Sequence, residues 1–209
     1  MIFIGSGIAD AAGEVMKAAG ASVPAGGSLT GALGGSPFAV GQFVTIISWN
    51  SGPAGATMSS PASGFTAHYN SNNGTRAANL WSIASLASAT QTITFSATRT
   101  RTRTLGWTNV QTGIVAFDVT YGTTPLTPGV LDVTGKPRAK IYSIIGGTTA
   151  SITFTAPGDL SDDGGLNGAN GWRRAELTTA VGAVSSYQVG QWTSTDNTQQ
   201  LVCITIAVE

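Results

Sequence analysis

The sequence contains 209 residues, enough for one β-sandwich or barrel domain whose hydrophobic core needs no disulfide or metal to fold. Only 10% of the residues are charged, compared with about 25% in an ordinary soluble domain, and the formal net charge is zero. This composition argues against electrostatic binding of DNA or of an anionic membrane. The weak charge repulsion favours a homo-oligomer or a subunit of a larger assembly.

The N-terminus lacks the features of a secretory signal peptide. Its opening run, Met-Ile-Phe-Ile-Gly-Ser-Gly, contains no basic residue and only a short apolar stretch. No apolar stretch in the sequence approaches the roughly 20 residues of a membrane-spanning helix. The single cysteine, Cys203, cannot form an intrachain disulfide. We therefore expect synthesis in a cytoplasm without a signal peptide, and no association with a membrane.

The segment 1–40 is predicted to form an N-terminal strand and a Gly/Ser/Ala-rich arm. Apolar residues between Ile8 and Ala19 have helical spacing, but Gly13 and Gly20 weaken any helix there. The following residues, up to Pro37, are rich in Gly and Ser. They are typical either of a mobile surface loop or of an arm that becomes ordered against a neighbouring subunit.

The segment 41–209 is predicted to be a single all-β domain. Period-two runs of β-branched and aromatic residues, bounded by Gly, Pro, Ser or Asn, indicate short strands. Several such strands separated by turn signals favour an antiparallel β-sandwich of jelly-roll or double Greek-key type. The predicted strands are 42–49, 75–83, 91–96, 113–120, 139–145, 151–155, 187–193 and 201–208.

The order of these features also predicts two loosely repeated halves within the domain. In each half a buried strand leads to a loop that contains proline, and two further strands follow. Duplicated hairpins of this kind are expected in a double Greek-key sandwich. The predicted equivalences are 43–49 with 139–145, the strand through Leu80 and Trp81 with 173–177, and the Thr-rich strand that follows Gln91 with 188–193.

The most unusual stretch is the alternation of threonine and arginine from Thr98 to Thr104. In a strand its three arginines share one face, and they continue the apolar face of the preceding residues. We therefore expect this strand to outrun its own core. It then forms either a solvated tip that discourages edge aggregation or a contact with carboxylates of another subunit. Three arginines are too few for nucleic-acid binding. The candidates for a subunit contact are Arg99, Arg101, Arg103 and Trp107.

No part of the sequence has the pattern of a catalytic or metal site. The acidic segment 159–170 has the spacing of a calcium loop, but Asn170 stands where a strong site has a bidentate Glu, so a surface loop is favoured. His68 is the only histidine and is expected to be a polar surface residue, whereas Cys203 is expected in the core. No Gly-x-Ser-x-Gly motif frames a nucleophile. We expect no catalytic, cofactor-binding or metal-binding residues, and no enzymatic activity.

Several short motifs together resemble the β-sandwich modules of tailed-phage virion proteins. That family usually has Pro-x-Gly-Trp where this chain has Phe65 in the Trp position, and a lysine where it has Ser82. The resemblance covers most of the chain. Its motifs are Ile2-Phe3-Ile4-Gly5-Ser6, Val23-Pro24, the strand 42–49, Ser60-Pro61-Ala62-Ser63-Gly64-Phe65-Thr66, Leu80-Trp81-Ser82-Ile83-Ala84 and Thr92-Ile93-Thr94-Phe95.

The resemblance implies a virion structural protein, located in the virion as a capsid decoration or tail component. Its partners would be other capsid or tail subunits, and it supplies no catalytic residues. The alternative function is a glycan-binding module that contacts a host surface, because an exposed tryptophan among the five in the chain could stack on a sugar ring. A hydrolase of surface polysaccharide is disfavoured because the chain has only ten acidic residues.

Overall fold

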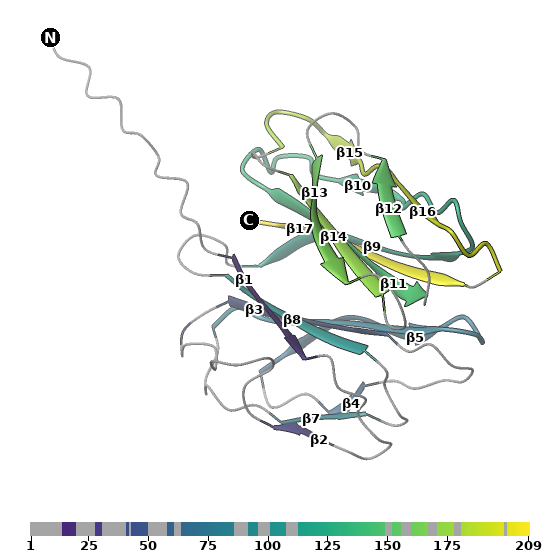
Figure 1. Ribbon diagram of the computed structural model, residues 1–209. Coiled ribbons are helices and arrows are strands. Elements are labelled where there is room, and N and C mark those ends of the chain that lie inside the picture. The colour runs from purple at the N-terminus through teal and green to yellow at the C-terminus, as the bar shows by residue number, and fades with distance from the viewer. Residues whose placement is uncertain are drawn as a thin grey trace, which may run out of the picture.

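The computed structural model of the protein consists of antiparallel β-sheets stacked on one another (Figure 1). None of the described residues is helical, and accordingly no helix among them has the length and hydropathy needed to cross a membrane. The prediction of an all-β, antiparallel fold is therefore confirmed for this part of the chain. The structure describes residues 14–19, 28–30, 41, 43–49, 58–60, 64–85, 92–95, 101–107, 113–148, 152–155, 160–166, 171–177, 181–198 and 200–209.

The first half of the chain forms a five-stranded sheet, called the N-terminal sheet here, and a three-stranded sheet beneath it. The order in the N-terminal sheet is β1 (Glu14–Ala19), β8 (Arg101–Trp107), β3 (Phe43–Trp49), β6 (Ala77–Ile83) and β5 (Thr66–Asn72). The order in the three-stranded sheet is β2 (Ser28–Thr30), β7 (Thr92–Phe95) and β4 (Met58–Ser60).

The second half forms another five-stranded sheet, the C-terminal sheet, which is covered by two short strand pairs. The C-terminal sheet contains β13 (Leu160–Leu166), β14 (Gly171–Leu177), β11 (Lys140–Thr148), β17 (Leu201–Val208) and β9 (Ile114–Gly122), in that order. The short pairs are β10 (Val130–Asp132) with β15 (Ser186–Gln188), and β12 (Ile152–Thr155) with β16 (Gln191–Ser194).

The two large sheets pack face to face, and the central strands β11 and β17 of the C-terminal sheet are buried on both faces. Strand β17 illustrates this burial. All eight of its residues are buried, and its apolar side chains alternate between two cores. The core between the large sheets contains Phe43, Ile47, Trp49, Ala78, Leu80, Tyr142, Ile144, Val202, Ile204, Ile206 and Val208. The core beneath the short strands contains Leu126, Leu131, Val133, Ala139, Ile141, Ile145, Ile152, Val189, Trp192, Leu201, Cys203 and Ala207.

One close contact places the large sheets over each other. The indole of Trp49 on β3 lies against Gly146 on β11, so close that a β-carbon at Gly146 would stand 2.3 Å from the indole nitrogen. Strand β3 therefore faces β11. On one side of this contact β6 lies next to β17, and the aromatic side chains of β5 meet those of β9.

Two local expectations from the sequence differ from the structure. Residues Glu14–Ala19, which lie in the stretch with helical spacing, form strand β1 and pair with β8. Most of the acidic segment expected to be a loop forms β13, which pairs with β14 and carries a β-bulge between Asp162 and Gly164. In both cases pairing with another strand outweighs the local residue preferences; β8 is distant from β1 in sequence, whereas β14 follows β13 in a hairpin. Apart from β1 and β2, the predicted arm lies outside the described residues.

Replacing Gly146 with alanine is expected to destabilise the protein because the added carbon overlaps the buried indole of Trp49. Overpacking of a core costs about 1–3 kcal/mol, and a Tm falls by roughly 2–4 °C per kcal/mol in a chain of this size. Thermal unfolding of Gly113→Ala is the matched control, because no atom lies within 4 Å of a β-carbon built at Gly113. Equal melting temperatures for the two variants would contradict this account of the contact.

Candidate functional site

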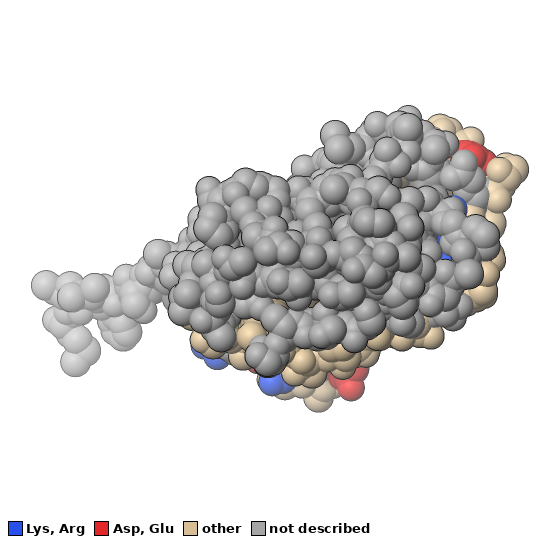
Figure 2. All heavy atoms as spheres, turned by 90° about the horizontal axis from the view of Figure 1, so that it is seen from below, with Lys and Arg blue, Asp and Glu red and all other residues tan. Residues whose placement is uncertain are grey.

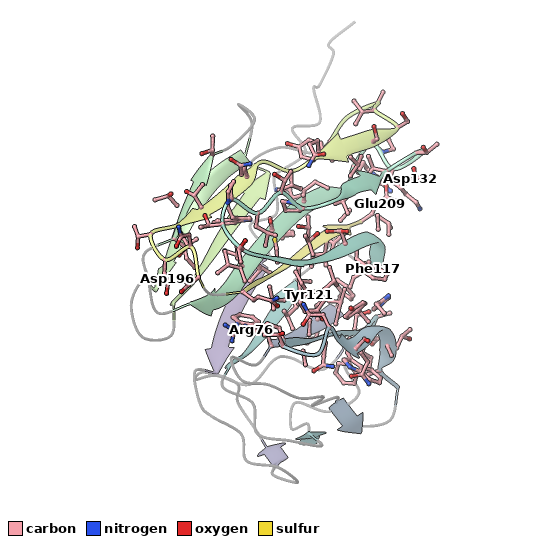
Figure 3. The ribbon with its side chains drawn as sticks, turned by 90° about the vertical axis from the view of Figure 1, so that its right-hand side faces the viewer. Arg76, Phe117, Tyr121, Asp132, Asp196 and Glu209 are labelled. Atoms are coloured by element: carbon pink, nitrogen blue, oxygen red, sulfur yellow. The ribbon has the colours of Figure 1, made fainter. Side chains whose placement is uncertain are left out.

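Two pairs of aromatic rings meet where the last strands of the two large sheets lie side by side. Strand β5 ends the N-terminal sheet and β9 ends the C-terminal sheet. The rings of His68 and Phe117 meet edge to face at 5.9 Å, and those of Tyr69 and Tyr121 lie 6.5 Å apart. The Tyr121 hydroxyl also donates a hydrogen bond to the Ser71 carbonyl oxygen at 3.3 Å. We call β5 and β9 together the edge surface; Phe117 and Tyr121, which belong to it, are labelled in Figure 3.

His68 is held at a β-bulge of β5 and points into the edge surface rather than freely into solvent. The bulge lies between Ala67 and Tyr69, and the Nε2 atom of His68 is 2.7 Å from the Ser82 hydroxyl. Partial burial lowers the pKa of His68 below its ordinary value. The sequence predicts a polar surface residue, whereas the structure places His68 in strand β5 with its ring partly buried. Its described contacts, Ser82 and Phe117, include no carboxylate that could orient the ring for nucleophilic catalysis.

Asp118 is the one acidic residue of β5 and β9. Its side chain lies on the face of β9 opposite to that of Phe117. Its Oδ2 atom accepts hydrogen bonds from the Thr120 hydroxyl at 2.5 Å and from the Gly129 backbone N–H at 2.9 Å. Gly129 approaches so closely that a β-carbon there would stand 2.5 Å from the carboxylate. The carboxylate therefore fixes the loop after β9 instead of projecting toward a ligand.

Cys203 is confirmed as a core residue. It is fully buried, and burial raises the pKa of its thiol to about 12. Its sulfur lies 3.3 Å from the Ser143 hydroxyl, which also accepts a hydrogen bond from the Trp192 indole N–H at 3.0 Å. A thiol that stays protonated in a closed core cannot serve as a nucleophile.

A polar joint connects the two halves beside the edge surface. The Nε atom of Arg76, a residue only 6% exposed, donates to the Gln200 backbone carbonyl at 2.9 Å. The side-chain amide of Asn73 donates to the side-chain oxygen of Gln200 at 3.0 Å. The turn between β5 and β6 is thereby attached to the residue that precedes β17. Arg76 thus has a structural role at this joint.

The arginine-rich strand lies inside the N-terminal sheet. Strand β8 pairs with β1 on one side and with β3 on the other, where Arg101 is opposite Trp49 and Arg103 is opposite Ile47. The expectation that the strand outruns its sheet is therefore wrong for Arg101–Trp107. Trp107 is opposite Phe43, and Arg99 lies outside the described residues. The assignment of these four residues to a subunit contact remains a prediction.

The described residues contain no group of three or more His, Cys, Asp or Glu side chains that could hold a metal ion. Two cations near the end of β17 are paired, with Lys136 Nζ 3.3 Å and Arg138 Nε 3.6 Å from the Glu209 carboxylate. The ends of the acidic segment, Asp159 and 167–170, lie outside the described residues.

No protein-family model, curated protein or solved structure matches this chain. The resemblance to tailed-phage virion modules is therefore an expectation from short motifs alone. Sequence reasoning did not find the edge surface, because its two strands are more than forty residues apart along the chain. The available signal was the near absence of charge in both strands, which contain the single ionised residue Asp118.

The stability of the protein is expected to fall as the pH drops from about 6.5 because of His68. The folded pKa of His68 lies below the unfolded value of 6.5, so the unfolded state binds the proton more readily, and the contribution is complete only above that pH. His68 is the sole histidine, so its ring signals in a proton NMR titration are unambiguous. A measured pKa at or above 6.5, or an unchanged pH dependence in His68→Gln, would contradict this assignment.

Proposed function

We propose that the protein is a non-enzymatic virion structural protein that assembles on a phage-like particle, as a capsid decoration or a tail component. Its fold in this proposal consists of two jelly-roll units in tandem. The observation that carries the proposal is the strand order, which follows the same rule in both halves of the chain.

The first half has the pairings of a jelly roll. A jelly roll has eight strands in two sheets. In one sheet the strand order is first, last, third and sixth. In the other sheet the order is second, seventh and fourth. The pairs β1–β8, β8–β3, β3–β6, β2–β7 and β7–β4 correspond to these in turn. Here β5 joins β6 as a hairpin in the larger sheet.

The second half repeats the order. Here β9 is the first strand, β11 the third, β14 the sixth and β17 the last. In the C-terminal sheet β9 pairs with β17, β17 pairs with β11, and β11 pairs with β14. The short strands β15 and β16 are separated by Val189 and Gly190 alone and act as one interrupted strand. They pair with β10 and β12, as β7 pairs with β2 and β4.

The hairpins β5–β6 and β13–β14 support the same equivalence. All four strands have seven residues, and in each hairpin four residues separate the two strands. Each hairpin carries a bulge in its first strand. In the sequence both connections begin with Asn-Gly, at Asn73-Gly74 and Asn167-Gly168. A shared hairpin of this detail favours duplication of one unit.

The step from fold to function is an analogy at the level of fold. Jelly rolls recur in viral capsid proteins and in lectins, and a low-charge, two-unit β-structure suits a protein that lives in an assembly. Charged atoms form small, separate spots among the described side chains seen in Figure 2. The charged side chains of Arg76, Asp118 and Glu209 form hydrogen bonds or ion pairs with other residues of the same chain.

The second candidate is a glycan-binding module, and one observation favours it. Phe117 is 39% exposed on the edge surface, and the exposed polar residue Ser71 lies on the same surface, next to Tyr121. Aromatic rings beside polar groups are suited to stacking on sugars. Retention of the isolated protein on a glycan array would favour this candidate.

The proposal predicts that particles of the phage that encodes the chain contain it in a fixed copy number. Purified particles would be separated on a density gradient, and the chain quantified by mass spectrometry. Hundreds of copies per particle would identify a capsid decoration, and a small multiple of three or six would identify a tail component. The proposal is wrong if the chain is absent from particles and does not bind them when added.

Changing Arg99, Arg101 and Arg103 together to serine is expected to weaken attachment to the particle with little change in melting temperature. A subunit contact through these residues would use bidentate pairing with carboxylates of the neighbour. Co-sedimentation with particles and thermal unfolding of the isolated chain measure the two effects separately. A melting temperature lowered by as much as in Gly146→Ala, with attachment intact, would assign the arginines to the fold.

A further inference from the structure

We propose that the edge surface binds a second copy of this chain, and that both large sheets continue across the contact. This inference deepens the proposed function, because it names one partner of the assembly and the surface used. The contact joins β9 to β9 and β5 to β5 across a two-fold axis normal to the sheets.

The first observation is that both large sheets end on the same side of the molecule. Within the described part of the chain, no strand pairs with the outer side of β5 or of β9. The two strands lie side by side, as the contacts of Tyr121 with Tyr69 and Ser71 show. An edge strand offers a row of backbone donors and acceptors that another strand can pair with.

The second observation is that neither strand contains the lysine or proline that protects many natural sheet edges, although each strand contains one β-bulge. Such edges are blunted by lysine, proline or inward-pointing charges, and they are commonly short. Strands β5 and β9 have seven and nine residues and contain no lysine, arginine or proline. The Asp118 carboxylate is bound by Thr120 and Gly129, and burial disfavours the charged form of His68. Neither strand therefore presents a cationic side chain that would repel a second copy.

The third observation is the exposed ring of Phe117, near the middle of β9 and beside β5 (Figure 3). Aromatic residues are enriched in the buried centres of protein interfaces. The other large apolar side chains that are exposed in the described residues, Val130 and Val184, lie outside the large sheets. Phe117 is thus placed to be covered when the two edges meet.

The geometry favours a second copy over an unrelated strand. Stacked sheets lie about 10 Å apart, so a partner that covers both edges must present two edges at that same separation. A second copy does so by construction. Rotation by 180° about an axis normal to the sheets keeps each sheet in its own layer and makes both new pairs antiparallel.

The area is sufficient for a specific but weak dimer. At about 3.4 Å per residue the longer strand spans about 30 Å, and two stacked sheets with their side chains are roughly 20 Å high. The contact therefore buries on the order of 600 Å² on each copy, or about 1,200 Å² in total, at the lower end of specific interfaces. Such a dimer forms at high local concentration, as on a particle surface.

Sedimentation velocity of the full chain over a range of concentrations tests the surface. Wild type is expected to form dimers, and Phe117→Lys and Ala67→Lys are each expected to weaken dimerisation at least tenfold, because a lysine on a sheet edge repels its own copy. Ala67 is exposed on β5 outside both cores, so its variant remains informative if Phe117→Lys fails to fold. The matched control is Val184→Lys, at a residue 44% exposed away from the edge surface, which should dimerise like wild type.

Cross-linking locates the contact independently. Because Cys203 is buried with a pKa of about 12, a cysteine introduced at the surface is the only reactive thiol. A short bismaleimide should link Ser71→Cys into covalent dimers and leave Val184→Cys monomeric. A wild type that stays monomeric, or a control that dimerises as poorly as Phe117→Lys, overturns the inference. Loss of glycan retention in Phe117→Lys with unchanged sedimentation also overturns it, in favour of a sugar site.

These results separate the inference from the proposed function. Dimers formed through the edge surface by a chain that never binds particles would contradict the virion role alone. Particles that contain the chain only as isolated monomers would contradict the edge contact alone.

Discussion

The packing of the two large sheets depends on one contact between a large and a small residue, Trp49 on Gly146. In the proposed tandem arrangement these residues occupy equivalent positions of the third strand in each unit. Two tryptophans facing each other there would collide, and two glycines would leave a void. The register shows a compensating exchange, since Trp49 is opposite Ala78 whereas Gly146 is opposite Trp172. Units that pack face to face must therefore differ in sequence at their contact, which explains why the repeat is visible in strand order but only loosely in residues.

The central strands β11 and β17 of the C-terminal sheet are covered on both faces, and this limits which polar groups they can contain. The Ser143 hydroxyl is acceptable there because it hydrogen-bonds with Trp192 and lies 3.1 Å from the Thr205 hydroxyl. In the N-terminal sheet some buried polar groups lack this compensation. Thr45 Oγ1 and Trp81 Nε1 are buried without a hydrogen-bond partner among the described residues.

Much of the fold was predictable because alternation of apolar residues is a local signal. Strands β3, β6, β7 and β17 lie within or close to their predicted ranges, and the equivalence of 43–49 with 139–145 matches the positions of β3 and β11. The misses have a common cause, which is that pairing with another strand outweighs the local residue preferences. The Asp- and Gly-rich β13 has poor strand propensity and is held by β14, and β8 lies inside a sheet because β1 comes from the segment taken as an arm. The edge surface could not be predicted, because it exists only where two sheets end together.

The position of β17 within its sheet has a consequence for the order in which the protein folds. Strand β17 lies between β9 and β11, yet it follows both of them by more than fifty residues along the chain. Ile114–Gly122 therefore leaves the ribosome long before β17, its neighbour in the described sheet, is synthesised. At about 5–20 residues per second this interval lasts several seconds, during which a strand with a single charged residue is available for incorrect pairing. Pairings so remote in sequence also form slowly once the chain is complete. We therefore expect chaperone dependence in the newly made chain to be concentrated in its second half.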